Sequence, residues 1–168
     1  MEGAAALVPR AGKGVGVKPW RRGVRALVLD TDDRILLVHF EFPPFPWTPP
    51  GGGMDPGETD EVALRRELAE ELGLDDFELG PLLWRREHEF DMALNFRGQR
   101  DNCYLVRVEP FEPAPRVDLA AEHVMEIRWW TADELRRSRE VFGPRRLPEL
   151  VGDLLESGAP PAPLELEN

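Results

Sequence analysis

The sequence predicts one α/β (α+β) domain in which a mixed β-sheet carries helices on its faces. Apolar, β-branched runs and segments of helical periodicity occur in the order strands, helix, strands, helix, helix. A length of 168 residues suits one hydrophobic core and is short for two. We expect a flexible arm over residues 1–20, a single domain over 21–158 and a disordered tail over 159–168.

The first two strands are expected at residues 24–29 and 35–39. Both are apolar runs, and the polar sequence DTDD between them is typical of a turn. The proline-rich sequence EFPPFPWTPP that follows prevents regular strand pairing. Its aromatic residues, Trp47 among them, could stack on a nucleobase at the mouth of a site or cover the edge of the core.

The best-defined helix follows a glycine-rich turn and is bounded by its own signals. Thr59 suits the N-cap, and Gly73 can end the helix in the left-handed conformation. Acidic residues follow Thr59 directly, where the positive end of the helix dipole favours them. Leucines recur every fourth residue and predict an apolar stripe that faces the core.

The rest of the chain predicts further strands and two short helices. The expected elements are strands over 82–90, 102–108 and 126–130, a helix that the capping box TADE begins at residue 131, and a last helix from Pro148 to about Gly158.

Composition limits the function classes. The formal charge of −11 would repel a nucleic-acid polymer, because the arginines are scattered along the chain. No apolar run approaches the ~18 residues that span a bilayer, so we expect a cytoplasmic protein without membrane association. Cys103 is the only cysteine, which excludes an internal disulfide, and it lies in a strand-like run where packing is the expected role.

Three carboxylates, those of Glu67, Glu70 and Glu71, cluster beside the leucine stripe of the first helix. On a solvated helix, like charges three or four residues apart cost only about 0.2–0.5 kcal/mol per pair, so a wet acidic face is one interpretation. The turn in front of the helix favours another. Its glycines let backbone atoms approach a ligand, and Mg²⁺ binds carboxylates, carbonyls and phosphate oxygens.

The segment GGGMDPGETDEVALRRELAEELGL resembles the Nudix box at every defined position. The matching positions are Gly52, Glu58 after five intervening residues, Arg66-Glu67-Leu68, Glu70-Glu71 and Gly73-Leu74. The likeness to Nudix hydrolases extends over roughly residues 22–140. It implies an α/β/α sandwich built on a mixed sheet.

The resemblance also implies an activity and a set of site residues. The expected enzyme uses Mg²⁺, with Mn²⁺ as a substitute, to hydrolyse the diphosphate linkage of a small nucleoside diphosphate derivative through a metal-activated water. The implied metal ligands are Glu67, Glu70, Glu71 and the carbonyl of Gly52. The implied supporting residues are Glu58 and Arg66, which form a salt bridge, together with Gly57 and Gly73.

The general base stays open between Glu67, another glutamate of the box, and Glu122 or Glu126. For the substrate, Arg97 and Arg100 are candidates to bind a phosphate, and Tyr104 is a candidate to stack on a base. A homodimer is compatible with the family. The alternative function is a non-catalytic nucleotide sensor or regulatory module on the same fold, and the identity of the nucleotide stays open.

Overall fold

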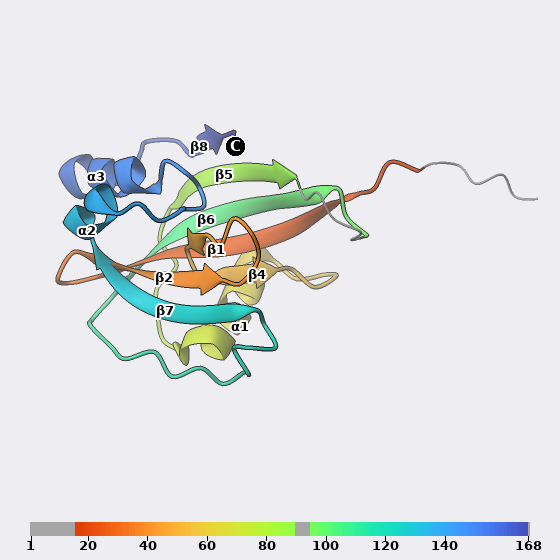
Figure 1. Cartoon of the computed structure of the whole chain (residues 1–168), viewed down its shortest axis with the longest axis horizontal. Coiled ribbons are helices and arrows are strands. Elements are labelled where there is room, and N and C mark those ends of the chain that lie inside the picture. Colours follow the sequence, from red (N-terminus) through yellow and green to blue (C-terminus); the bar gives the residue numbers. More distant parts are fainter. Residues whose placement is uncertain (1–15, 90–94, 168) are drawn as a thin grey trace, which may run out of the picture.

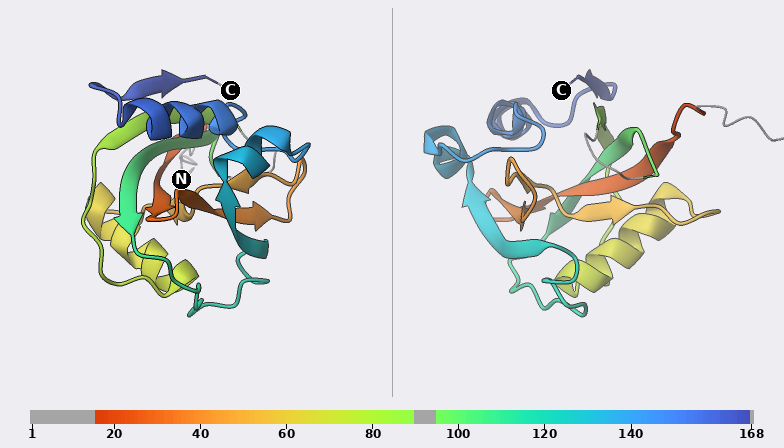
Figure 2. Two further views of the ribbon diagram at one scale, coloured as in Figure 1. Left: turned by 90° about the vertical axis from the view of Figure 1, so that its left-hand side faces the viewer. Right: turned by 45° about the vertical axis from the view of Figure 1, so that its right-hand side comes forward.

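The structure, a computed structural model, describes residues 16–89 and 95–167. An eight-stranded mixed sheet carries α1 (Asp60–Leu72) on one face and α2 (Ala132–Arg137) and α3 (Leu147–Ser157) on the other (Figure 1). Figure 2 shows α1 and α3 on opposite sides of the curved sheet. The predicted α/β/α arrangement is confirmed.

The sheet combines parallel and antiparallel pairs. Its strands are β1 (Trp20–Asp30), β2 (Arg34–Phe40), β3 (Trp47–Thr48), β4 (Gly51–Gly53), β5 (Leu82–Glu89), β6 (Gly98–Val108), β7 (Val124–Thr131) and β8 (Leu164–Leu166). The order is β3-β2-β1-β6-β5-β8, with β4 paired to β1 and β7 paired to β2. The β1–β6 and β5–β8 pairs are parallel, and the other pairs are antiparallel.

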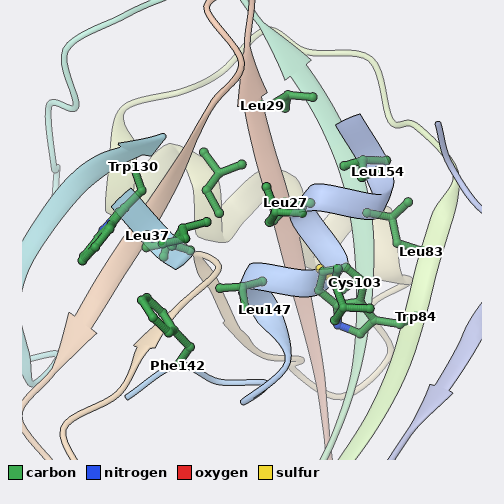
Figure 3. Close-up of a cluster of buried hydrophobic side chains, with 14 of the residues drawn as sticks. Leu27, Leu29, Leu37, Leu83, Trp84, Cys103, Trp130, Phe142, Leu147 and Leu154 are labelled. Atoms are coloured by element: carbon green, nitrogen blue, oxygen red, sulfur yellow. The ribbon is translucent and has the colours of Figure 1, made fainter. Parts of the chain in front are cut away.

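Successive residues of the central strands enter two separate cores, because side chains alternate across a sheet. Val24, Ala26 and Val28 of β1 pack with the leucine stripe of α1. Leu27 and Leu29 face the other way, into a core that α2 and α3 cover. Figure 3 shows this second core, where side chains of α3 meet those of the sheet. Alternate residues of β1 therefore belong to the core on the α1 side and to the core on the α2 and α3 side.

The predicted helix boundaries are confirmed by local hydrogen bonds. The Thr59 hydroxyl accepts a hydrogen bond from the Val62 amide at 3.3 Å, and Gly73 has φ 67° and donates to the Ala69 carbonyl. At α2, the Thr131 hydroxyl and the Glu134 carboxylate satisfy each other's backbone amides. The caps fix where α1 begins and ends, and therefore where its glutamates lie relative to the glycine turn.

The C-terminal segment differs from the prediction. Residues 164–166 form β8, an edge strand parallel to β5, so the expected disordered tail is wrong at this position. Leu166 is buried in the core that α3 covers, and Glu165 accepts from Arg85 at 2.8 Å. One apolar side chain and pairing to an open sheet edge are enough to order this short segment.

Two other boundaries also differ. β6 begins at Gly98, four residues before the predicted strand, because its first residues pair with both β1 and β5. β1 begins at Trp20, while residues 16–19 have no regular structure, and most of the predicted arm lies outside the described residues. No helix within residues 16–89 and 95–167 has the length and apolar character to cross a membrane.

Candidate active site

The three glycines of β4 each make room for a different neighbour. Gly51 has φ +136°, a conformation that favours glycine, and it pairs closely with β1. A Cβ atom on Gly52 would lie 2.7 Å from Glu67 Oε1, so the absent side chain is what lets this carboxylate approach the turn. A Cβ atom on Gly53 would overlap the guanidinium group of Arg21. The absence of side chains on the turn therefore lets charged groups pack directly against its backbone.

Glu71 is the most deeply buried carboxylate of α1. Its residue is 6% exposed, and Oε2 accepts a hydrogen bond from the Gly51 amide at 3.1 Å. Burial raises the pKa of Glu71 to about 8, an effect that the charge of Arg25 opposes and that of Glu67 reinforces. Burial destabilises the ionised form of this carboxyl group, so a cation placed beside it would stabilise that form strongly.

Arg66 links the glycine turn to the helix. Its Nε and Nη2 atoms donate to the two oxygens of Glu58 at 2.8 and 2.7 Å, and Nη2 also donates to the Gly53 carbonyl at 3.2 Å. The hydrogen bonds from Arg66 lower the pKa of Glu58 to about 2. The salt bridge expected between these residues is present. Gly57, with φ +85°, shapes the loop just before Glu58.

The same arginine also contacts two of the proposed metal ligands. Arg66 Nη1 donates to Glu67 Oε1 at 2.8 Å and lies 3.8 Å from Glu70 Oε2. Burial raises the pKa of Glu67, and the bond to Arg66 opposes the shift. A guanidinium group thus lies between two carboxylates, where a metal ion would also be attracted.

The donor set suits a divalent cation, although it is not gathered into a finished site. Within the two described stretches, no three His, Cys, Asp or Glu side chains are arranged to hold a metal ion. Glu67 lies against the backbone of Gly52, and Glu71 is bound to the adjacent Gly51 amide. Hard oxygen donors next to an open backbone turn are the ligands that Mg²⁺ and Mn²⁺ prefer.

The two candidate bases outside the helix lie on the loop before β7 and at its start. Glu122 and Glu126 are both exposed. The charge of Glu122 contributes to the raised pKa of Glu71, which brings this residue into the electrostatic surroundings of the site. Glu126 pairs in register with His39 of β2.

A half-buried arginine of β1, which the sequence interpretation missed, also supports the turn. Arg25 Nη1 donates to the carbonyls of Pro49 and Gly51 at 3.2 and 3.3 Å, and its Nε lies 3.7 Å from Asp101 Oδ2. Asp101 is 4% exposed. The signal was that Arg25 is the single charged residue of the predicted apolar strand 24–29, since a charge withdrawn from water requires partners.

Trp47 does not present a face to a ligand. It is 3% exposed, its ring stacks on His39 at 4.4 Å between centroids, and Trp130 packs against its edge at 5.0 Å. The prediction that Trp47 binds substrate is therefore corrected, and the alternative of a core residue holds. Pairing of β3 with β2 draws the tryptophan into the core that α3 covers.

The three remaining substrate candidates have partners within the protein. Arg97 is paired with Glu89, Arg100 is paired with Glu87, and both guanidinium groups lie about 5 Å from the Trp20 ring (5.2 and 4.8 Å). Tyr104 donates to Asp60 Oδ2 at 2.7 Å, at the first turn of α1. Their roles in binding stay predictions, and Tyr104 lies at the opposite end of α1 from Glu71.

Cys103 and His88 lie in buried surroundings. Cys103 is 1% exposed, and burial raises the pKa of its thiol, which favours the packing role over a reactive thiolate. Burial also lowers the pKa of His88 to about 4, while the charge of nearby Asp101 opposes this shift. His88 is therefore neutral at physiological pH.

Comparison with known proteins agrees with this geometry. The NUDIX domain model matches residues 19–150. An RNA pyrophosphohydrolase of Caulobacter vibrioides (strain NA1000 / CB15N) is 33% identical over 138 residues, which cover 74% of this chain and 77% of that protein. The match to the NUDIX domain model spans both the glycine turn and the carboxylate helix.

Solved structures share the fold. The MutT NUDIX hydrolase from Burkholderia pseudomallei superposes with a TM-score of 0.57 and 29% identity, covering 76% of this chain and 94% of that one. The NUDIX domain of Shewanella oneidensis NrtR, solved with ADP ribose, has a TM-score of 0.61 at 22% identity, covering 82% and 90%. This chain belongs to the NUDIX domain family and is a hydrolase that acts on pyrophosphate bonds.

Proposed function

We propose that the protein uses Mg²⁺, or Mn²⁺ in its place, to hydrolyse the diphosphate linkage of a nucleoside diphosphate derivative. The observation that carries this proposal is the approach of two α1 carboxylates to one turn. Glu71 is bound to the Gly51 amide, and Glu67 lies against Gly52. A cytoplasmic location, where such nucleotides are formed, fits the proposal.

In this proposal, Glu67, Glu70, Glu71 and the Gly52 carbonyl hold the metal. A divalent cation bound there would neutralise charge on the diphosphate oxygens and lower the pKa of the attacking water. Glu70 is the most exposed of the three carboxylates, with a side chain that is 44% exposed, so it lies on the solvent side of the set. Glu71 forms the buried side.

The chain's own contribution is to hold this set in place before the substrate arrives. Arg66 ties the Gly53 carbonyl to Glu58, and Arg25 ties the Gly51 carbonyl to the region of Asp101. The turn is thus held by arginines from two elements. Preorganised groups of this kind reduce the reorganisation that a reaction requires.

A proton acceptor for the attacking water is proposed among Glu67, Glu122 and Glu126. Glu122 is favoured among the two outside the helix, because its charge acts on Glu71. Separate Glu122→Gln and Glu126→Gln variants test this choice. If one of these residues is the general base, kcat of its variant should no longer fall at low pH with the pH dependence of the wild type. The other variant should keep that acidic limb of the pH–rate profile.

A second substrate class is RNA that carries a pyrophosphate group at its 5′ end. The name of the Caulobacter relative favours it, since that protein is an RNA pyrophosphohydrolase. The formal charge of −11 opposes tight binding of a long polyanion. The two classes differ in how rates should respond to salt, because contacts with several phosphates make binding strongly salt-dependent.

One panel experiment tests both classes and the sensor alternative. ADP-ribose, other nucleoside diphosphate derivatives and a short 5′-triphosphorylated RNA are incubated with Mg²⁺ or Mn²⁺, and the products identify the broken bond. Hydrolysis that Glu71→Gln abolishes supports the proposal. Tight binding of a nucleotide without turnover, by the wild-type protein, supports the sensor alternative instead.

A further inference from the structure

Two neighbouring arginines at the start of β1 have different surroundings. Arg22 lies 3.3 Å from Asp60 Oδ1 at the N-terminus of α1, so its charge has a partner. Arg21 is exposed, and apart from the backbone pairing of β1, its side chain makes no hydrogen bond or ion pair with any residue in the described part of the chain.

The guanidinium group of Arg21 lies against the glycine turn. A Cβ atom on Gly53 would overlap its Nη2, Cζ and Nε atoms, so the group fills the space that a side chain at this position would need. Gly53 is not in the left-handed region, because its φ is not among the positive values of the chain. An alanine at this position would therefore displace the end of the flexible Arg21 side chain.

Gly53 also lies next to the proposed metal ligands. Its carbonyl accepts from Arg66 at 3.2 Å, and the preceding glycine lies against Glu67. Arg66 already has Glu58, Glu67 and this carbonyl as partners. Of the two guanidinium groups beside Gly53, only that of Arg21 keeps its donors available among the described residues.

Successive residues of a strand direct their side chains to opposite faces. The carboxylate of Glu67 therefore lies on the α1 side of β4, and Arg21 lies on the other side, at the next residue. A diphosphate group placed at the edge of β4 would meet the acidic metal ligands on one side of the strand and Arg21 on the other. Arginine binds phosphate through charge-assisted, often bidentate hydrogen bonds.

We propose that Arg21 is a substrate-binding residue whose guanidinium group binds a phosphate oxygen of the diphosphate at the edge of the glycine turn. This inference rests on the proposed function, because it assumes a diphosphate ligand at this turn. It assigns to Gly53 a separate role from Gly52. Gly52 makes room for a metal ligand, and Gly53 makes room for the phosphate-binding arginine.

The test measures binding of adenosine 5′-(α,β-methylene)diphosphate, a diphosphate that cannot be hydrolysed, in the presence of Mg²⁺. Arg21→Ala should weaken binding by about 10- to 100-fold, the range for hydrogen bonds to charged groups. The control Arg22→Ala removes a neighbouring, also exposed arginine that is paired with Asp60, and it should bind within about twofold of wild type. Mn²⁺ affinity without nucleotide should not fall in Arg21→Ala.

Gly53→Ala provides an independent test, because it changes the space that the Arg21 guanidinium group occupies. The added methyl group should displace the guanidinium group, so this variant should resemble Arg21→Ala, and the double variant should be no weaker than either single one. Unchanged melting temperatures show that the variants fold. Fully additive effects, wild-type binding by Arg21→Ala, or no binding of the analogue to the wild-type protein would each overturn the inference.

The inference and the proposed function can fail separately. If the wild-type protein hydrolyses a nucleotide and Arg21→Ala keeps the same KM, the function stands and the role of Arg21 is lost. If no substrate is hydrolysed but the analogue binds in an Arg21-dependent way, the binding role stands and the enzymatic proposal is lost.

Discussion

Arg66 binds both carboxylate oxygens of Glu58, through Nε at 2.8 Å and Nη2 at 2.7 Å, across eight residues of sequence. This bidentate pair connects the loop before α1 to the second turn of the helix. The Glu58 side chain is only 14% exposed, so water screens the pair less than it screens an ordinary surface pair. Because Arg66 also binds Gly53 and Glu67, the pair controls the position of the turn and of a proposed ligand.

Glu58→Gln should therefore weaken metal binding without removing a ligand. Replacement of a group that orients a metal ligand typically costs 10- to 100-fold in affinity, and we expect a loss of about that size for Mn²⁺, measured by calorimetry. The matched control is Glu61→Gln, which breaks the exposed pair with Arg65 at 2.8 Å and should change affinity by less than about twofold. Wild-type affinity in Glu58→Gln would show that the pair does not position the site.

Gly52→Ala should damage the site from the backbone side. Its Cβ atom would lie 2.7 Å from Glu67 Oε1 and would push the carboxylate away from the turn. We expect kcat/KM with Mg²⁺ to fall by at least about tenfold, because misplaced catalytic groups lose rate steeply. Gly152→Ala in α3 is the control, since a Cβ there meets nothing within 4 Å.

That control should keep wild-type kinetics and gain up to about 1 kcal/mol of stability, because alanine is the better helix former. Equal loss of activity in both variants would point to a general intolerance of alanine rather than to the contact with Glu67. Urea unfolding and steady-state kinetics on the same preparations separate the two effects.

The raised pKa of Glu71 predicts how stability depends on pH in the metal-free protein. Its folded-state pKa of about 8 exceeds the ordinary value of 4.5, so its contribution to stability is complete below about pH 4.5 and is lost as the pH rises through about 8. Between pH 6 and 9, the wild-type melting temperature in EDTA should fall relative to that of Glu71→Gln. A change of about 2–4 °C is expected for each kcal/mol lost.

Added Mg²⁺ should reverse this trend, because a bound cation stabilises the ionised carboxylate and competes with the proton. The stabilisation of the wild-type protein by Mg²⁺ should therefore be larger at pH 8 than at pH 6. Parallel pH curves for the wild type and Glu71→Gln would contradict the assignment of Glu71 as the buried titrating group.

Features that depend on neighbours in sequence were predictable, and features that depend on distant pairing were not. The caps Thr59 and Gly73 and the capping box at Thr131 each act within four residues, so the chain itself specifies them. The partners of Arg25 and the burial of Trp47 depend on which strands meet in the sheet. Periodicity cannot reveal such contacts, because it describes one element at a time.

The same reasoning explains why the C-terminal strand was missed. The sequence PLELEN is short, polar on alternate residues and rich in charge, so local propensity favours a tail. The edge of β5 supplies backbone partners that no local rule includes. Leu166 then becomes 9% exposed, while Leu164 stays 40% exposed on the same three-residue strand.

These two leucines provide a matched pair that tests whether β8 stabilises the domain. Leu166→Ala removes a buried side chain and should lower the free energy of unfolding by about 2 kcal/mol, near the lower end for leucine in a core, because the strand lies at an edge. Leu164→Ala should cost less than about 0.5 kcal/mol, as expected for an exposed position. Urea unfolding of both variants gives the comparison, and equal small effects would mean that residues 164–166 do not pack on β5 in solution.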